Sequence, residues 1–312
     1  SSWTLTALPL FVWMGEILFR TKLSENLFAG LSPWMQKLPG GLIHVNVVGC
    51  ALFAAISGSS AATVATVGKM SIPELRKRKY PEKILLGSLA GSGTLGLLIP
   101  PSIILIIYGV TVQESIAKLF IAGIIPGIMI ALIFMSYVII WSLINKKSMP
   151  KYVENFSFLE KIRKSKQLLP VIVLISAVIG SIYTGVATAT EAASLGVIGA
   201  LILSYFQKSL TIETFKQSLL GATKTSCMIA FILAGSTFLS LAMGFTGLPR
   251  NLAIWIQNME LSPYVLIFVL MIFYIILGMF LDGISAVVLT MAIIEPMIRQ
   301  AGFDMIWFGI FL

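Results

Sequence analysis

The feature that most constrains this chain is a series of long apolar stretches that recurs along its whole length. About 20 consecutive apolar residues cross the hydrocarbon core of a bilayer, and residues 119–144 form such a stretch. Only 11% of the residues are charged, against about 25% in a soluble domain, so a soluble enzyme is excluded. Because the apolar residues are continuous and do not alternate with period two, a membrane β-barrel is excluded as well. The sequence predicts an all-α polytopic membrane protein.

The positive charges predict how this protein is oriented. Of the 22 Lys and Arg residues, 19 lie in four loops, at residues 20–41, 69–83, 145–167 and 207–224. All four fit on the cytoplasmic side, where loops are rich in Lys and Arg; the net charge of +9 therefore does not indicate nucleic acid. This placement requires residues 42–72 and 264–300 to enter and leave the membrane on one side each, as re-entrant hairpins from opposite faces.

The two predicted hairpins share an order of segments. In both cases a span and an amphipathic arm come first, and the hairpin follows as a short apolar piece, a small-residue polar tip and a second apolar piece. A shift of 223 positions places Pro73 on Pro296 and Arg76 on Arg299. Opposite entry sides with one order indicate inverted-topology repeats, each with a hairpin and a broken helix, which are typical of secondary transporters. The same shift would place the second broken helix beyond Leu312, so we expect the chain to be cut at both ends.

Small polar residues form the first tip, Ser57 to Thr63, and we expect the interrupted stretch 91–102 to face it. Unwound backbone within the bilayer needs partners, because each unpaired group costs several kcal/mol. Carbonyl and hydroxyl oxygens suit a hard cation such as sodium, whereas helix N-terminal amides attract a carboxylate. The alternative is that Gly and Ser only allow close helix packing.

Three acidic or metal-binding candidates remain. Asp282 lies within an apolar stretch, where it could ligate sodium, take up a proton or cap a helix. Glu191, with Thr190, is expected to open a helix as a capping pair. His44 has no Cys or His at ligand spacing, so no metal site other than sodium is expected. Nucleotide-binding and hydrolase motifs do not occur, which predicts that the protein is not an enzyme.

Several of these segments resemble one family. The strings SGSSAATV at 57–64, GTLGLLIPPS at 93–102, LFIAGIIPG at 119–127 and TATEAA at 188–193 resemble the large membrane subunit of tripartite ATP-independent periplasmic (TRAP) transporters. The resemblance extends over nearly the whole chain, and the first and second strings are the most specific. Ala189 departs from it, because the family usually has Pro before Thr-Glu-Ala.

The resemblance implies a sodium-coupled importer of organic acids, such as sialic acid or dicarboxylates, in the bacterial inner membrane. It implies an elevator mechanism in which residues 42–117 and 264–312 form the transport domain, and residues 1–41 and 118–263 the scaffold. It also implies two sodium sites, at Ser57, Gly58, Ser59, Ser60, Thr63, Gly93, Thr94 and Pro100, and at Gly278 and Asp282. Substrate would bind near Ser60, Ala61 and Gly283.

The implied partners are a small four-helix membrane (Q) subunit, a periplasmic solute-binding protein (P subunit), the organic-acid substrate and membrane lipid. Sodium is the implied co-transported ion. A channel or an ion exchanger on similar hairpins is the alternative, and it would work without a binding protein.

Overall fold

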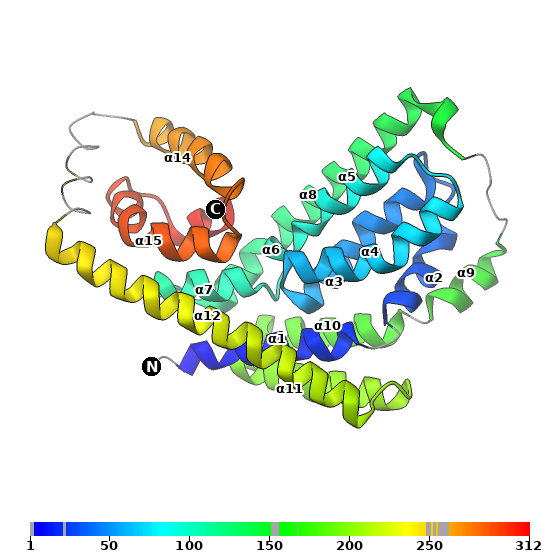
Figure 1. Cartoon of the computed structure of the whole chain (residues 1–312), viewed down its shortest axis with the longest axis horizontal. Helices are drawn as coiled ribbons and strands as arrows, with labels where there is room; N and C mark the ends of the chain where they lie inside the picture. The colour runs from blue at the N-terminus through cyan, green and yellow to red at the C-terminus, as the bar shows by residue number, and fades with distance from the viewer. Residues whose placement is uncertain are drawn as a thin grey trace.

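The computed structural model describes residues 3–20, 23–150, 156–166, 168–247, 251, 254 and 262–312. Helices account for all regular elements in these ranges, and no strand occurs among them (Figure 1). Four of these helices are long and apolar enough to cross a membrane, and two bent helix pairs raise that number to six. The predicted all-α polytopic membrane protein is confirmed.

The N-terminal third contains the predicted first hairpin and broken helix. Its elements are η1 (Trp3–Thr6), α1 (Ala7–Phe19), α2 (Leu23–Met35), η2 (Gly41–Ile43), α3 (His44–Ser57), α4 (Ser60–Lys77), α5 (Glu82–Gly93), α6 (Leu95–Leu98) and α7 (Ile103–Thr111). Helices α3 and α4 pack against each other and against α5. The run from α5 to α7 bends by 40°. The sequence predicts these interruptions, because Gly, Thr and paired prolines stand where the helices end.

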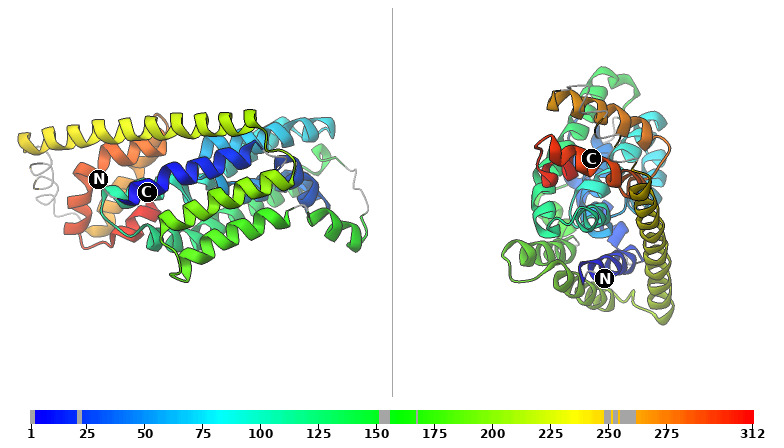
Figure 2. Two further views of the ribbon diagram at one scale, coloured as in Figure 1. Left: turned by 90° about the horizontal axis from the view of Figure 1, so that it is seen from below. Right: turned by 90° about the vertical axis from the view of Figure 1, so that its left-hand side faces the viewer.

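The remaining helices include the longest ones. They are α8 (Ile116–Ile144), η3 (Lys146–Ser148), α9 (Phe158–Ser165), α10 (Leu169–Tyr183), α11 (Ala189–Phe206), α12 (Ile212–Thr246), α14 (Pro263–Gly278), α15 (Gly283–Gln300) and α16 (Met305–Phe311). Helix α12 runs beside α1 and reaches α15 (Figures 1 and 2). Most of the predicted second arm, residues 246–263, lies outside the described residues.

Two sequence predictions about helix starts need correction. The polar, amphipathic composition of residues 208–218 predicts a segment separate from the apolar span 222–244, but Ile212–Thr246 form the single helix α12. No proline separates them, and Gly221 costs only about 1 kcal/mol in a helix. The cap of α11 is Thr188 and not Thr190: its hydroxyl accepts the Glu191 N–H, and the Glu191 carboxylate accepts the Thr188 N–H. Glu191 is thus part of a capping box, but its partner is Thr188, two residues before the expected Thr190.

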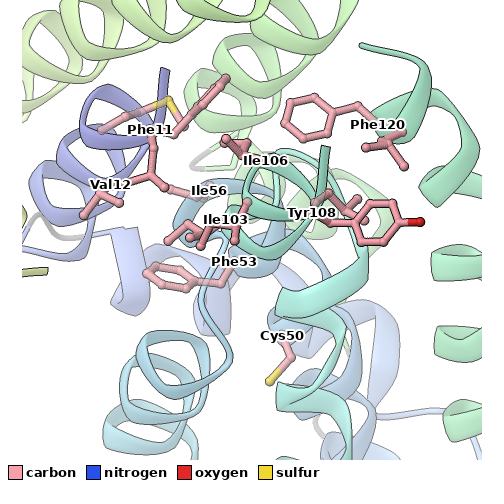
Figure 3. Packing of buried hydrophobic residues seen from close by; sticks show 14 of the residues in the cluster. Phe11, Val12, Cys50, Phe53, Ile56, Ile103, Ile106, Tyr108 and Phe120 are labelled. Atoms are coloured by element: carbon pink, nitrogen blue, oxygen red, sulfur yellow. The ribbon is translucent and has the colours of Figure 1, made fainter. Parts of the chain in front are cut away.

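A buried apolar cluster joins α1, α3 and α7 at the centre of the molecule. Phe11 of α1, Phe53 and Ile56 of α3, and Ile103 and Ile106 of α7 lie within it (Figure 3). These residues are at most 4% exposed. The cluster therefore attaches the hairpin and the broken helix to the N-terminal helix.

The structure also brings the basic loops together. Arg20, Lys69, Arg78 and Lys164 come from three of the four basic segments and line one cavity. The fourth segment joins them, because Gly221 of α12 packs against Glu16, one turn from Arg20. Arg299, by contrast, lies near α7, where it pairs with Glu114 and Glu295. Three of the four basic segments therefore meet at one cavity, and the cytoplasmic placement of all four stays a prediction.

Candidate functional site

The first hairpin tip is a two-residue break between α3 and α4. Gly58 ends α3 in the left-handed conformation, with φ at +56°, and its N–H donates to the carbonyl of Ala54 at 3.0 Å. Ser59 is extended, and its hydroxyl accepts the N–H of Ala62 at 3.4 Å. Glycine supplies the positive φ without steric cost, and serine supplies the cap, so the local sequence determines this turn.

Inside the tip, hydroxyl groups bind one another and the backbone. The oxygens of Ser57 and Thr63 are 2.9 Å apart, and the Thr63 hydroxyl donates to the Ser59 carbonyl at 2.7 Å. Ser57 is 8% exposed and Thr63 is fully buried. These short distances bring several oxygen atoms together within a small volume. Each hydroxyl oxygen has two lone pairs, so it can accept a bond while it donates one.

The broken helix supplies a second set of oxygens. Thr94 separates α5 from α6, and its hydroxyl donates to the Gly91 carbonyl at 2.7 Å. Pro100 and Pro101, joined by a cis peptide bond, separate α6 from α7. Pro100 has no N–H to donate to the carbonyl four residues earlier, at Gly96. The Gly96 carbonyl thus lacks its helical donor, whereas the Leu97 carbonyl accepts the Ser102 hydroxyl at 2.5 Å.

The tip and the broken helix meet backbone to backbone. A Cβ added to Gly96 would lie 3.0 Å from the carbonyl carbon and oxygen of Ser59. A Cβ added to Gly58 would lie 2.8 Å from the carbonyl oxygen of Pro101 and 3.0 Å from the nitrogen of Ile103. The Ile103 N–H donates to the Gly58 carbonyl at 3.3 Å. The interrupted stretch therefore faces the first tip, as the sequence predicts.

The other residues of the first predicted site lie close by. A Cβ on Gly93 would collide with Val64 and would lie 3.8 Å from the Ser60 carbonyl oxygen. Ser60 and Ala61 form the first turn of α4; Ser60 is half-buried and Ala61 is exposed. Of the residues assigned to the first sodium site, Gly58 and Ser59 therefore lie against the broken helix and Gly93 lies near Ser60, whereas Thr94 is exposed.

The second tip separates α14 from α15. Asp282 caps α15, since its Oδ2 accepts the N–H of Ile284 at 3.2 Å and that of Ser285 at 3.4 Å. A Cβ on Gly283 would lie 2.7 Å from Ile104 and 3.7 Å from Leu97, so this tip also adjoins the broken helix. A Cβ added to Gly278 would meet nothing within 4 Å in the described structure. Across the described ranges, no cluster of three His, Cys, Asp or Glu side chains occurs.

Sequence reasoning missed one polar residue that holds this region together. Asn46, fully buried in α3, donates to the Ser88 hydroxyl at 3.0 Å and to the Leu85 carbonyl at 3.2 Å, both in α5. Ser92 donates in turn to the Asn46 carbonyl at 3.4 Å. The signal was present, because Asn46 is the only amide side chain in the apolar stretch 42–57.

The fold and the site define a class: a polytopic helical membrane protein in which hairpin tips meet a broken helix, an architecture of secondary transporters. Comparison with known proteins is more specific. The family model described as "Tripartite ATP-independent periplasmic transporter, DctM component" matches residues 1–312. The chain belongs to this family, and it is an inner-membrane protein.

Individual relatives agree with this assignment. The chain is 31% identical to the C4-dicarboxylate TRAP transporter large permease protein DctM of Pseudomonas aeruginosa, covering 99% of this chain and 72% of the relative. It is 30% identical to the sialic acid TRAP transporter large permease protein SiaM of Vibrio cholerae, with the same coverage of both chains. It is also 30% identical to the isethionate permease protein DctMQ of Oleidesulfovibrio alaskensis, covering 100% of this chain and 49% of the relative. These relatives are named as permeases, which supports transport and not catalysis.

Proposed function

We propose that this protein is the large subunit of a sodium-coupled secondary importer of organic acids that works by an elevator mechanism. The observation that carries the proposal is the close contact between the first hairpin tip and the broken helix. Hydroxyls of Ser57, Ser59 and Thr63 and the carbonyls near Pro100 supply the hard oxygen ligands that sodium prefers.

The helix bounds support the proposed inverted repeat. Helices α4 and α15 both contain 18 residues, and their caps, Ser59 and Asp282, are 223 positions apart. The same shift relates the starts of α5 and α16, at Glu82 and Met305. Two pairs of helices thus begin at positions related by the same shift of 223 residues. This agreement supports a shared architecture more strongly than the few identical residues at that shift.

The packing of helices supports a division into two domains. We assign residues 42–117 and 264–312 to a moving transport domain, and residues 1–41 and 118–263 to a scaffold. Within the first group, α3, α4, α5 and α6 contact one another, α7 contacts α6, and α15 contacts α7. Within the second, α1 packs on α11 and α12. The central apolar cluster lies between the two groups, at the surface along which an elevator would slide.

The substrate and the partners follow from the relatives. We propose an organic anion as substrate, since relatives are named for C4-dicarboxylates, sialic acid and isethionate. Its carboxylate would bind near Ser60, Ala61 and Gly283, where the N-termini of α4 and α15 offer amide groups. A second sodium would bind near Gly278 and Asp282. A small membrane (Q) subunit would extend the scaffold, and a periplasmic (P) protein would deliver the substrate.

Reconstitution into proteoliposomes tests the proposed function. The permease, with its small subunit, is supplied with the cognate binding protein, a labelled organic acid and an inward sodium gradient. We expect uptake only when sodium and the binding protein are both present. Sodium flux or antiport of equal size without the binding protein would instead establish the channel or exchanger.

Variants in the same assay test the assigned sites. In the described structure the Ser60 hydroxyl has no hydrogen-bond partner, so Ser60→Ala should leave folding intact and weaken sodium activation. Ser136→Ala is the matched control, because its hydroxyl donates within α8 to Leu132. Asp282→Ser keeps a capping oxygen and removes the charge, and it should also weaken sodium activation. Unchanged sodium activation in Ser60→Ala and Asp282→Ser would refute the site assignment.

A further inference from the structure

A cavity of about 770 Å³ lies at the basic end of the molecule, away from the hairpin tips. Residues of α2 and α4 form most of its walls, and the end of α1, Phe156 and Lys164 of α9 complete them. Its volume falls within the range of about 300–1,000 Å³ that is usual for binding sites of small molecules. None of the residues discussed above for ion or substrate binding lines it.

Cationic side chains from separate segments converge on this cavity. Arg20, Lys69, Arg78 and Lys164 line it, together with one acid, Glu74. Arg20 pairs with Glu16 and Arg78 with Glu74, at 3.7 Å for the second pair. Within the described ranges, Lys69 and Lys164 have no carboxylate partner. The Lys164 ammonium lies 3.9 Å from the centre of the Phe156 ring. The cavity therefore has a net positive charge and two uncompensated ammonium groups.

Most of the other lining residues are apolar, and three are polar but uncharged: Ser32, Gln36 and Thr66. Phe19, Phe28 and Met70 supply apolar surface. Thr66 is 2% exposed, and its Oγ1 has no hydrogen-bond partner in the described structure. A buried polar group without a partner costs about 1–3 kcal/mol, so it favours a ligand that can bond to it. Cations at one part and apolar surface at another suit an amphiphilic anion better than a small, fully polar one.

Helix α9 places this cavity at the level of the lipid headgroups. Its Phe158, Leu159 and Ile162 side chains are 67%, 79% and 40% exposed, while three of the other five positions are basic: Lys161, Arg163 and Lys164. A short helix of this kind lies in the membrane interface. Trp34 of α2 holds it there, since its indole N–H donates to Ser165 at 2.7 Å and its ring packs on Phe158.

We propose that this cavity binds the headgroup of an anionic phospholipid. The phosphate would lie between the ammonium groups of Lys69 and Lys164, and the first part of an acyl chain would lie along Phe19 and Phe28. Basic pockets between membrane helices on the cytoplasmic side recognise acidic headgroups in this way. Because the lipid would touch both α2 and α4, it would join the arm to the hairpin.

Native mass spectrometry of the purified chain in detergent tests this proposal. Dioleoyl phosphatidylglycerol and dioleoyl phosphatidylcholine, which differ in headgroup charge, are added at equal concentration. We expect the wild type to retain the anionic lipid preferentially. In Lys69→Gln/Lys164→Gln its affinity should fall about thirty-fold, which corresponds to about 2 kcal/mol for two cations. Lys216→Gln/Lys224→Gln, which removes two charges from the exposed face of α12, should bind as the wild type does.

Three results would overturn the assignment. Equal retention of the two lipids would show that charge is not recognised. An equal loss in both double variants would show that only the net charge matters. If soluble glycerol phosphate displaced phosphatidylglycerol at similar concentrations, the site would be one for a free anion and not for a lipid. Circular dichroism of each variant checks that the helices are retained.

Discussion

Replacing Gly58 with alanine should be among the most damaging single-atom additions in this protein. Two costs combine there. A non-glycine residue in the left-handed conformation costs about 1–2 kcal/mol. In addition, the new Cβ would lie 2.8 Å from the Pro101 carbonyl oxygen and 3.0 Å from the Ile103 nitrogen, which are backbone atoms and cannot rotate away. Overpacking of this kind costs about 1–3 kcal/mol.

The expected total for Gly58→Ala is therefore about 2–5 kcal/mol of lost stability. Gly185→Ala separates the two costs, because Gly185 has a φ of +71° but nothing within 4 Å of its added Cβ. It should lose only about 1–2 kcal/mol. Gly96→Ala provides the converse case, with the backbone contact to Ser59 but without a positive φ.

Unfolding of the three variants in detergent, followed by tryptophan fluorescence, measures these differences. Gly58→Ala should unfold most readily, and the other two should lie between it and the wild type. If Gly58→Ala and Gly185→Ala lose the same stability, the tip does not press against the broken helix in solution. The packing argument for the site would then be wrong.

Three further substitutions test other contacts. Asn46→Ala should cost about 1–3 kcal/mol in the free energy of unfolding, because it leaves Ser88 without its buried donor; Cys227→Ala on the exposed face of α12 is a control expected to be neutral. Thr188→Ala should cost about 1 kcal/mol by removing the cap of α11, measured by thermal denaturation. Burial raises the pKa of Tyr80 above its usual 10, so the unfolded chain ionises first and stability should fall as pH rises above about 10. Tyr80→Phe should remove that alkaline loss; an unchanged pH profile would contradict it.

The sequence reveals most of the helices and breaks because these depend on local chemistry. Gly58, which takes up a positive φ, and the pair Pro100 and Pro101, which lacks two successive N–H groups, stand where helices end. The continuous helix α8 follows from a long apolar stretch, in which Pro126 does not interrupt the helix. Such features need no knowledge of the tertiary structure.

What the sequence leaves undetermined depends on contacts between distant residues. The approach of Gly96 to Ser59 requires two segments about 37 positions apart to meet, and no local pattern encodes the distance. The cavity lined by Arg20, Lys69 and Lys164 likewise arises only when three loops converge. Charge counting can place those loops on one side of a membrane, but it cannot say which of the side chains share a pocket.

The sequence leaves open whether Asp282 caps a helix or binds an ion, and the structure shows that it can do both. Capping and ion binding look like alternatives as long as only the residue type is known. In the structure both capping hydrogen bonds go to one oxygen, Oδ2, and within the described residues Oδ1 has no hydrogen-bond partner. Ser59, at the equivalent position of the first tip, has a single hydroxyl oxygen for its cap. A carboxylate can cap the helix with one oxygen and offer the other to a cation, so Asp282 can perform both roles at this tip. Whether it also binds sodium is tested by the sodium activation of uptake in Asp282→Ser.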